Sequence, residues 1–371
     1  SHTDPYGNTI GYGYDANSNR TSLTYPGSKV VTYVYDELNR LTDVIDWLAN
    51  TTHYDYDVSS RLIQITNPNG TTAGYGYDNA DRLTSLSNEK ADGSVISSYI
   101  YTLDEIGNHV AEQRDEPLLP NLTQGTTNYS YDTENRLTEV DGLTNTFDDN
   151  GNQTGKGAAT YSYDYEDRLV EYTANAITTT YDYDGLGERY RRTVDGTAKR
   201  FVLDTNTALT NVLAEADASN TITAYNVYGY GLISRILPDN TAVFYHYDSR
   251  GSTAALTDDS ETITDQYTYT PFGQLLSRSG ATVNPYSYLG QFGLQEEGQD
   301  LFFIRARYFD AENGRFLSKD SYRGEDSDSQ SLNRYIYALN NPVRYVDISG
   351  YSAQEGEVLG VSTGSSDTEH N

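Results

Sequence analysis

The sequence contains no cysteine and no methionine, and it is poor in basic residues. Without cysteine, disulfides and thiolate chemistry are excluded. The 25 Lys and Arg against 54 Asp and Glu give a formal net charge of −29 and a pI near 4.3. This imbalance argues against a nucleic-acid partner and against binding to an anionic membrane surface. No apolar run approaches about 20 residues, so no membrane span is expected.

Methionine is missing even at position 1, where the chain starts with Ser1 and turn-forming residues. We therefore expect a C-terminal piece of a longer product. Hydrophobic residues reach only 36%, which together with the acidic charge would normally indicate disorder. The 36 tyrosines, beside 9 Phe and 1 Trp, oppose that interpretation. Tyrosine is a large side chain that favours strands.

The triplet Tyr-x-Tyr recurs along the chain and defines an internal repeat. The best copies, which begin at Tyr33, Tyr54, Tyr75, Tyr129 and Tyr161, share the pattern Tyr-x-Tyr-Asp-x-x-x-Arg-Leu. Their framework residues are Tyr35, Asp36, Arg40, Tyr56, Asp57, Arg61, Tyr77, Asp78, Arg82, Tyr131, Asp132, Arg136, Tyr163, Asp164 and Arg168.

Each copy is predicted to form a strand, a turn and a second strand. Alternation places both tyrosines on one sheet face, and the Asp opens the turn by accepting backbone N–H groups two residues on. No sustained helical period is present. Because one hairpin of this length is not stable alone, the hairpins are expected to stack into a coiled all-β solenoid. The tyrosines are interpreted as ladder and core residues, with sugar binding through exposed tyrosines as the alternative.

This pattern resembles the YD repeat of the Rhs family over roughly residues 6 to 350. The C-terminal part carries the most specific landmarks, Arg307-Tyr308-Phe309-Asp310, Gly314-Arg315-Phe316-Leu317-Ser318 and Asn340-Asn341-Pro342, which resemble the Rhs-associated core. The resemblance implies a spiral of β-hairpins that forms a hollow shell or barrel. It divides the chain into a spiral (1–300), a core-like plug (301–351) and a short polar tail (352–371).

In bacterial members of the family the core acts as an aspartyl autoprotease, and the resemblance assigns the two carboxylates to Asp320 and Asp347. Both aspartates are present, although Ser321 and Ile348 stand where the family has proline. Two neighbouring carboxylates that share one proton can activate water against a peptide bond. Arg315 is a candidate to orient one carboxylate, or it simply pairs with a strand acid. The family cuts just after the second motif, which predicts cleavage between Tyr351 and Ser352.

Two functions follow as expectations. The first is a secreted or cell-surface shell that encloses a polypeptide, its own C-terminal segment or a passenger, and releases it by autoproteolysis. The second is a non-enzymatic structural or adhesive extracellular protein that self-assembles into filaments or binds a cell-surface partner. The tail is too short for a toxin domain, and its Val358–Val361 segment is a candidate edge strand. The five histidines show no metal spacing. No cofactor is expected, and Ca²⁺ at an acidic turn remains the alternative.

Overall fold

The computed structural model describes residues 1–118, 125–325 and 330–355. Its strands form two long antiparallel sheets in which every strand lies beside its neighbour in sequence. The first sheet contains β1 (His2–Thr3), β2 (Thr9–Tyr14), β3 (Arg20–Tyr25), β4 (Lys29–Tyr35), β5 (Leu41–Ile45), β6 (Thr51–Tyr56), β7 (Leu62–Thr66), β8 (Thr72–Tyr77), β9 (Leu83–Glu89), β10 (Val95–Leu103) and β11 (His109–Asp115). The short 3₁₀ helix η1 (Pro26–Ser28) joins β3 to β4.

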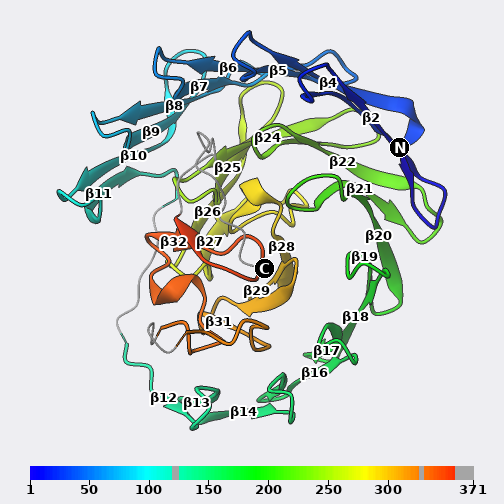
Figure 1. Ribbon diagram of the computed structural model, residues 1–371, viewed down its shortest axis with the longest axis vertical. Helices are drawn as coiled ribbons and strands as arrows, with labels where there is room; N and C mark the ends of the chain where they lie inside the picture. The colour runs from blue at the N-terminus through cyan, green and yellow to red at the C-terminus, as the bar shows by residue number, and fades with distance from the viewer. Residues whose placement is uncertain (119–124, 326–329, 356–371) are drawn as a thin grey trace.

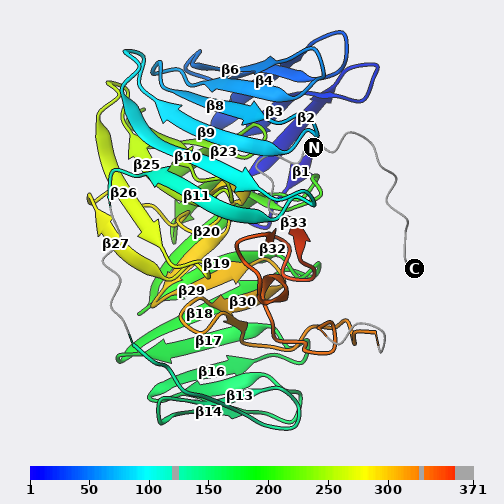
Figure 2. The same ribbon diagram turned by 90° about the vertical axis from the view of Figure 1, so that its left-hand side faces the viewer.

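The second sheet has 16 strands. They are β12 (Tyr129–Tyr131), β13 (Leu137–Val140), β14 (Leu143–Phe147), β15 (Gln153–Lys156), β16 (Ala159–Tyr163), β17 (Leu169–Ala174), β18 (Ile177–Tyr183), β19 (Arg189–Val194), β20 (Thr197–Asp204), β21 (Asn211–Asp217), β22 (Ile222–Tyr228), β23 (Leu232–Ile236), β24 (Ala242–Tyr247), β25 (Thr253–Thr257), β26 (Ile263–Tyr269) and β27 (Leu275–Ser279). Figure 1 shows this sheet as a wall that curves round the centre of the molecule, and Figure 2 shows its hairpins stacked.

The plug contains the smaller elements. Just before the plug come η2 (Gly290–Phe292) and β28 (Gln295–Gly298). The plug itself has β29 (Leu301–Ile304), β30 (Arg307–Asp310), β31 (Arg315–Phe316), η3 (Ala338–Asn340) and β32 (Tyr345–Val346), and β33 (Gln354–Glu355) follows it. Strands β28 to β31 form a four-stranded sheet, and β32 pairs with β33. In Figure 1 this sheet lies on the concave side of the wall. Phe302, Phe309 and Tyr337 of this region are buried in the same core as Leu23 of the first sheet and Tyr225 of the wall.

The repeat aspartate builds each hairpin turn. Asp36 Oδ1 accepts the N–H groups of Leu38 and Arg40, each at 2.9 Å, and Asp36 Oδ2 lies 2.6 Å from Arg40 Nη2. The residue after the two turn positions, Asn39, has a φ of +60°. The left-handed region is least costly for Gly, Asn and Asp, which explains why those residue types recur at this position.

The repeat arginine and tyrosine join one hairpin to the next. Arg40 lies over the ring of Tyr56, 4.6 Å from its centroid, and the Tyr56 hydroxyl donates to the Leu41 carbonyl at 2.6 Å. The same two contacts recur at Tyr77, whose ring lies 5.1 Å from Arg61 and whose hydroxyl donates to the Leu62 carbonyl at 2.8 Å. The first tyrosine of the triplet is buried at Tyr33, Tyr54 and Tyr161, whereas Tyr129 in β12 is 46% exposed. Neighbouring hairpins of the first sheet are therefore joined by contacts that repeat with the sequence.

Together these features confirm the all-β spiral of hairpins with a C-terminal plug. The two sheets are separate, however, and the break falls between β11 and β12. Both of these end strands are exposed along their whole length. Nothing in the fold tests the proposed boundaries at 300 and 351, and Val358–Val361 lies outside the described residues.

Candidate aspartyl site in the plug

Arg307 joins the two candidate aspartates. Its Nη2 lies 2.7 Å from Asp320 Oδ2 and 3.6 Å from Asp347 Oδ2. The guanidinium itself is buried and stacks on the ring of Phe316, 3.7 Å from the ring centroid. The structure thus brings together the two carboxylates, which are separated by 26 residues of sequence, around one cation.

Local structure fixes each carboxylate. Asp347 follows β32, and its Oδ1 accepts the N–H groups of Ser349 at 3.2 Å and Gly350 at 2.7 Å. Asp320 is held through its backbone, since its N–H donates to the Arg334 carbonyl at 2.8 Å. The Arg334 side chain also donates to the Asp320 carbonyl. Neither aspartate therefore depends on a proline after it for its position.

The two carboxylates lie in different environments. Asp347 is 2% exposed, and burial raises the pKa of its carboxyl, although Arg307 and the hydrogen bonds from Gly350 and Ser349 act against that rise. Asp320 has the shorter ion pair with Arg307. Burial lowers the pKa of Arg307, and the two aspartates oppose that shift. A pair of carboxylates with unequal environments suits one protonated and one ionised partner.

The loop after Asp347 passes directly over this site. Arg307 Nε donates to the Gly350 carbonyl, which belongs to the Gly350–Tyr351 peptide bond. Gly350 has a φ of +80°, and a β-carbon there would clash with the Ile304 carbonyl oxygen. Glycine is therefore required at this close approach. Tyr351 itself is 61% exposed, and Ser352 follows it on the surface.

Arg315 lies elsewhere. Its Nη2 is 3.3 Å from the Tyr131 hydroxyl, and its guanidinium lies over the Tyr131 ring at 5.2 Å. The contact that the sequence analysis sought from Arg315 is made by Arg307. Arg307 also belongs to the core-like landmarks of the sequence, but no sequence pattern ranks it above Arg315. The hairpin that turns Arg307 toward both aspartates forms only in the tertiary structure.

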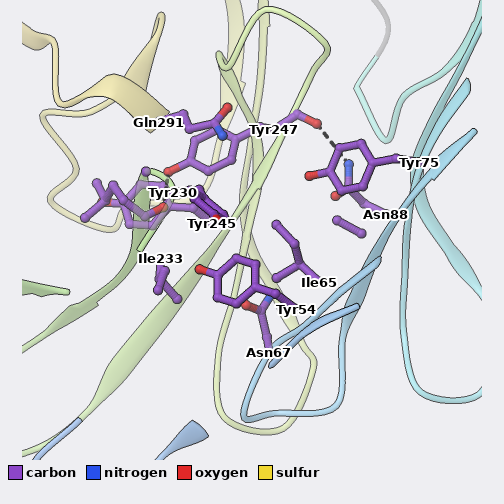
Figure 3. A pocket seen from close by; sticks show the side chains of 13 residues that line it. Tyr54, Ile65, Asn67, Tyr75, Asn88, Tyr230, Ile233, Tyr245, Tyr247 and Gln291 are labelled. Carbon is purple, nitrogen blue, oxygen red and sulfur yellow. Dashed lines mark hydrogen bonds between the residues drawn. The ribbon is translucent and has the colours of Figure 1, made fainter. Parts of the chain in front are cut away.

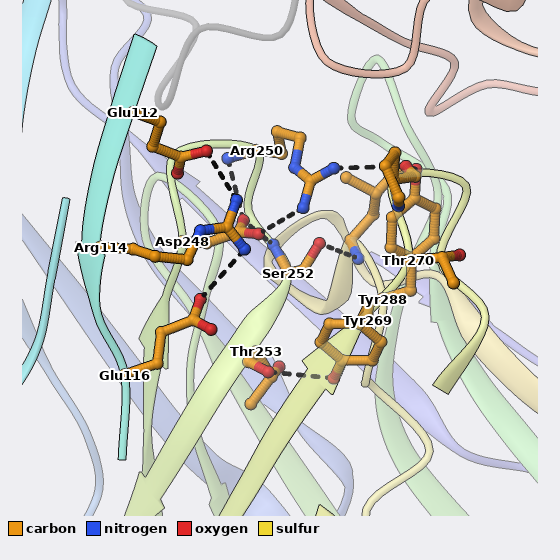
Figure 4. A network of polar contacts seen from close by, with 12 residues as sticks. Glu112, Arg114, Glu116, Asp248, Arg250, Ser252, Thr253, Tyr269, Thr270 and Tyr288 are labelled. Carbon is orange, nitrogen blue, oxygen red and sulfur yellow. Dashed lines mark hydrogen bonds and ion pairs between the residues drawn. The ribbon is translucent and has the colours of Figure 1, made fainter. Parts of the chain in front are cut away.

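Two further polar clusters lie away from this site. A cavity of about 40 Å³ lies between the first and second sheets. Its lining includes Tyr54, Tyr75 and Tyr230, which Figure 3 shows. It has room for about one water molecule. Figure 4 shows Arg114 of β11 between Glu112 and Glu116, beside the Asp248–Arg250 pair in the turn after β24 of the second sheet. The two ion pairs of Arg114 lie within the end of the first sheet, and the ion pair of Arg250 lies within one turn of the second sheet.

Within the described residues no group of three or more metal-ligating side chains is close enough to hold a metal ion. In the same part of the chain no helix is long and apolar enough to cross a membrane.

A curved wall of tyrosine-rich hairpins around a plug defines a class of shell proteins, and sequence comparison gives the family. The sequence model of the teneurin YD-shell matches residues 92–343, and the RHS repeat model matches residues 35–72 and 56–95. The chain belongs to the teneurin YD-shell family, and its N-terminal part also matches the RHS repeat.

Two relatives and two solved structures illustrate the match. The chain is 32% identical over 267 residues to the tRNA3(Ser)-specific nuclease WapA of Bacillus spizizenii and equally to the tRNA nuclease WapA of Bacillus subtilis. The matches cover 70% of this chain but only 11% of either relative. The crystal structure of TcdB2-TccC3-Cdc42 superposes with a TM-score of 0.68 at 17% identity, covering 93% of this chain and 22% of that one. The Tc holotoxin pore of Photorhabdus luminescens gives 0.68 at 16% identity, with 94% and 21% coverage.

Proposed function

We propose that this chain is a shell whose plug cuts its own polypeptide as an aspartyl autoprotease. The observation that carries the proposal is the convergence of Asp320, Asp347 and the Gly350 carbonyl on the single guanidinium of Arg307. Two unequal carboxylates beside one polarised peptide carbonyl are the groups that acid–base hydrolysis of that peptide requires.

The environments assign the roles. Asp320, which makes the shorter ion pair with Arg307, takes a proton from the attacking water. The water oxygen bonds to the carbonyl carbon, and Arg307 stabilises the charge that develops on the carbonyl oxygen. Burial raises the pKa of the Asp347 carboxyl, which favours its protonated form. It gives that proton to the leaving nitrogen as the carbon–nitrogen bond breaks.

The contact from Arg307 selects the Gly350–Tyr351 bond. This bond lies one residue before the Tyr351–Ser352 bond predicted from the sequence. The two alternatives differ by one tyrosine at the start of the released fragment, so the mass of that fragment distinguishes them.

The wider role that fits this chemistry is encapsulation of a C-terminal segment or passenger outside the cell. The curved wall with the plug on its concave side supports an enclosing role, and the acidic, cysteine-free composition suits secretion or display at the cell surface. The nuclease activity in the names of the Bacillus relatives belongs to whole proteins of which this chain covers 11%. It is not part of the proposal.

Denaturing intact mass of the purified chain tests the proposal. We expect a wild-type chain that ends at Gly350, or at Tyr351 if the neighbouring bond is cut, together with a separate downstream peptide. Asp347→Asn should give one uncut mass, whereas Glu37→Gln, at an exposed turn of the first sheet, should cut like the wild type. A wild-type mass that continues through Asn371, or an Asp347→Asn chain that still cuts, would contradict the autoprotease.

A second candidate function is structural self-assembly. The observation that favours it is β11, a seven-residue end strand that is exposed throughout. Unpaired edge strands are templates for pairing with another chain. In sedimentation velocity the wild type should form larger species as its concentration rises, and Val110→Lys should reduce them. Ile106→Lys, at an exposed turn before the strand, should not. A wild type that stays monomeric at every concentration would contradict this function.

A further inference from the structure

The loop that carries Asp347 is hydrogen-bonded to three successive residues of one hairpin, the two turn residues and the first residue of the strand that follows. Arg305 Nη1 donates to the Ile348 carbonyl at 2.7 Å, and the Ala306 N–H donates to the Ser349 carbonyl at 3.3 Å. Arg307 Nε then donates to the Gly350 carbonyl. Arg305 and Ala306 form the two-residue turn between β29 and β30, in which Ile304 pairs with Arg307. The position of the loop is therefore set by this turn.

Arg305 differs from Arg307 in its other partners. Its Nε donates to the Thr210 carbonyl at 3.1 Å, and its Nη2 donates to the Phe292 carbonyl at 2.6 Å. Among the described residues it makes no ion pair with a carboxylate, so its charge is compensated by three carbonyl oxygens. Burial lowers the pKa of Arg305 to about 10, which leaves the side chain charged at neutral pH.

The three carbonyls come from three separate segments. Ile348 belongs to the loop of Asp347, Phe292 ends η2, and Thr210 lies in the wall just before β21. Thr210 is itself anchored, because its hydroxyl donates to Glu188 Oε1 at 2.7 Å. A continuous set of contacts thus runs from Glu188 in the wall through Thr210 and Arg305 to the aspartate loop.

We propose that Arg305 is a positioning residue that couples autoproteolysis to the seating of the plug in the wall. This inference rests on the proposed autoprotease and adds its regulation. Arg305 can make its three carbonyl contacts only when the wall, η2 and the plug are assembled. If one of the three segments were displaced, the half-buried cation would lose an acceptor, which is costly. The assembled wall thus fixes the Ile348 carbonyl, and with it the Gly350 peptide, against the two aspartates. A chain whose shell is incomplete would keep its aspartates and leave the bond uncut.

The first test compares cleavage rates in the full chain. Arg305→Met should slow cleavage by about 100-fold, since a misplacement of about 1 Å at a reacting group costs that much. Arg305→Lys should recover part of the rate because it keeps a buried cation that can bind a carbonyl. Thr210→Ala, which removes only the anchor of the wall carbonyl, should also slow cleavage. Thr223→Ala is the matched control, since it removes a hydroxyl bond to the Glu215 carbonyl on the same wall, and it should cut at the wild-type rate.

A pH profile distinguishes positioning from proton transfer. The Arg305 variants should lower the rate at every pH and leave the shape of the profile unchanged, because the two aspartates keep their surroundings. Cleavage by Arg305→Met at the wild-type rate would overturn the coupling. So would an equal slowing of cleavage in Thr210→Ala and Thr223→Ala.

Hydrogen exchange decides the coupling independently of cleavage. In an Asp320→Asn chain, which should remain uncut, the amides of Ser349 and Gly350 are protected by Asp347. Adding Arg305→Met or Thr210→Ala should speed their exchange, and adding Thr223→Ala should not. Unchanged exchange in the first two variants would reject the coupling. A wild type that never cuts would reject the autoprotease alone, and the exchange result would still stand.

Discussion

Arg307 Nη2 lies 3.6 Å from Asp347 Oδ2, and yet the pKa of the Asp347 carboxyl is raised. Burial outweighs the neighbouring cation, because that cation is shared with Asp320 at a shorter distance. This inequality between two acids of the same chemical type is what allows one of them to donate a proton and the other to accept one. Among the arginines of the plug we therefore expect Arg307 to matter most for cleavage.

Arg307→Gln should abolish measurable cleavage, because it removes the group that holds Asp320 and the Gly350 carbonyl. The loss of one donor that stabilises a developing oxyanion costs about 10²- to 10³-fold in rate. Arg315→Gln is the matched control, since Arg315 contacts Tyr131 instead. Intact mass after a fixed incubation reports both. Equal cleavage in the two variants would remove Arg307 from the mechanism.

The cleavage rate should depend on pH through Asp347. Its carboxyl must be protonated to donate, so the rate should fall as the pH rises through its raised pKa. The same direction holds for stability. A carboxyl with a raised folded-state pKa contributes most below its unfolded value, and that contribution is lost as the pH rises through the folded value. Rates measured by mass spectrometry across pH 4 to 8 check this, and a rate that increases steadily with pH would contradict the assigned role.

Glu215→Gln should destabilise the wall. Glu215 is 1% exposed and lies 2.9 Å from Arg235 and 2.6 Å from Lys199. Removing one partner of a buried ion pair costs about 3–5 kcal/mol of the free energy of unfolding. Glu139→Gln, at an exposed strand position, should change it little. Chemical denaturation of the two variants gives the comparison, and similar midpoints would show that the pair is not needed for stability.

The fall in the free energy of unfolding at acidic pH should also depend on Glu215. Although burial acts to raise it, Arg235 and Lys199 lower the pKa of this carboxyl to about 2. Because the folded value lies below the unfolded one, the stabilisation is present above the unfolded value and is lost as the pH falls toward 2. Glu215→Gln should therefore flatten this part of the curve. Urea denaturation at several pH values tests it, and a curve as steep as that of the wild type would exclude Glu215 as its source.

The two tyrosines of one repeat should respond differently to loss of their hydroxyls. The Tyr183 hydroxyl donates to the Leu169 carbonyl at 2.8 Å, so Tyr183→Phe should cost about 1 kcal/mol of the free energy of unfolding. The Tyr181 hydroxyl is buried with no hydrogen-bond partner among the described residues. Tyr181→Phe should therefore be neutral or slightly stabilising. Thermal unfolding ranks the two, and the reverse order would contradict the ladder described for the wall.

Much of the fold could be predicted because its information is local. The Tyr-x-Tyr-Asp-x-x-x-Arg-Leu pattern contains the strand alternation, the turn-forming aspartate and the turn position with positive φ, as Asp36 and Asn39 show. Repetition then predicts stacking, since one hairpin cannot bury its own tyrosines. The break between β11 and β12 was not predicted, because the repeat pattern indicates that hairpins stack but not where the sheet divides.

The repeated pattern of the sequence predicts the all-β spiral and its hairpin turns, and the resemblance to the Rhs-associated core supplies the two candidate aspartates. Only the tertiary structure decided which arginine joins Asp320 to Asp347, which peptide carbonyl lies beside them, and that Arg305 connects this loop to Thr210 in the wall. These contacts link residues from 13 to 95 positions apart. They depend on how the plug packs inside the wall, and side-chain packing between distant segments leaves no periodic trace in a single sequence.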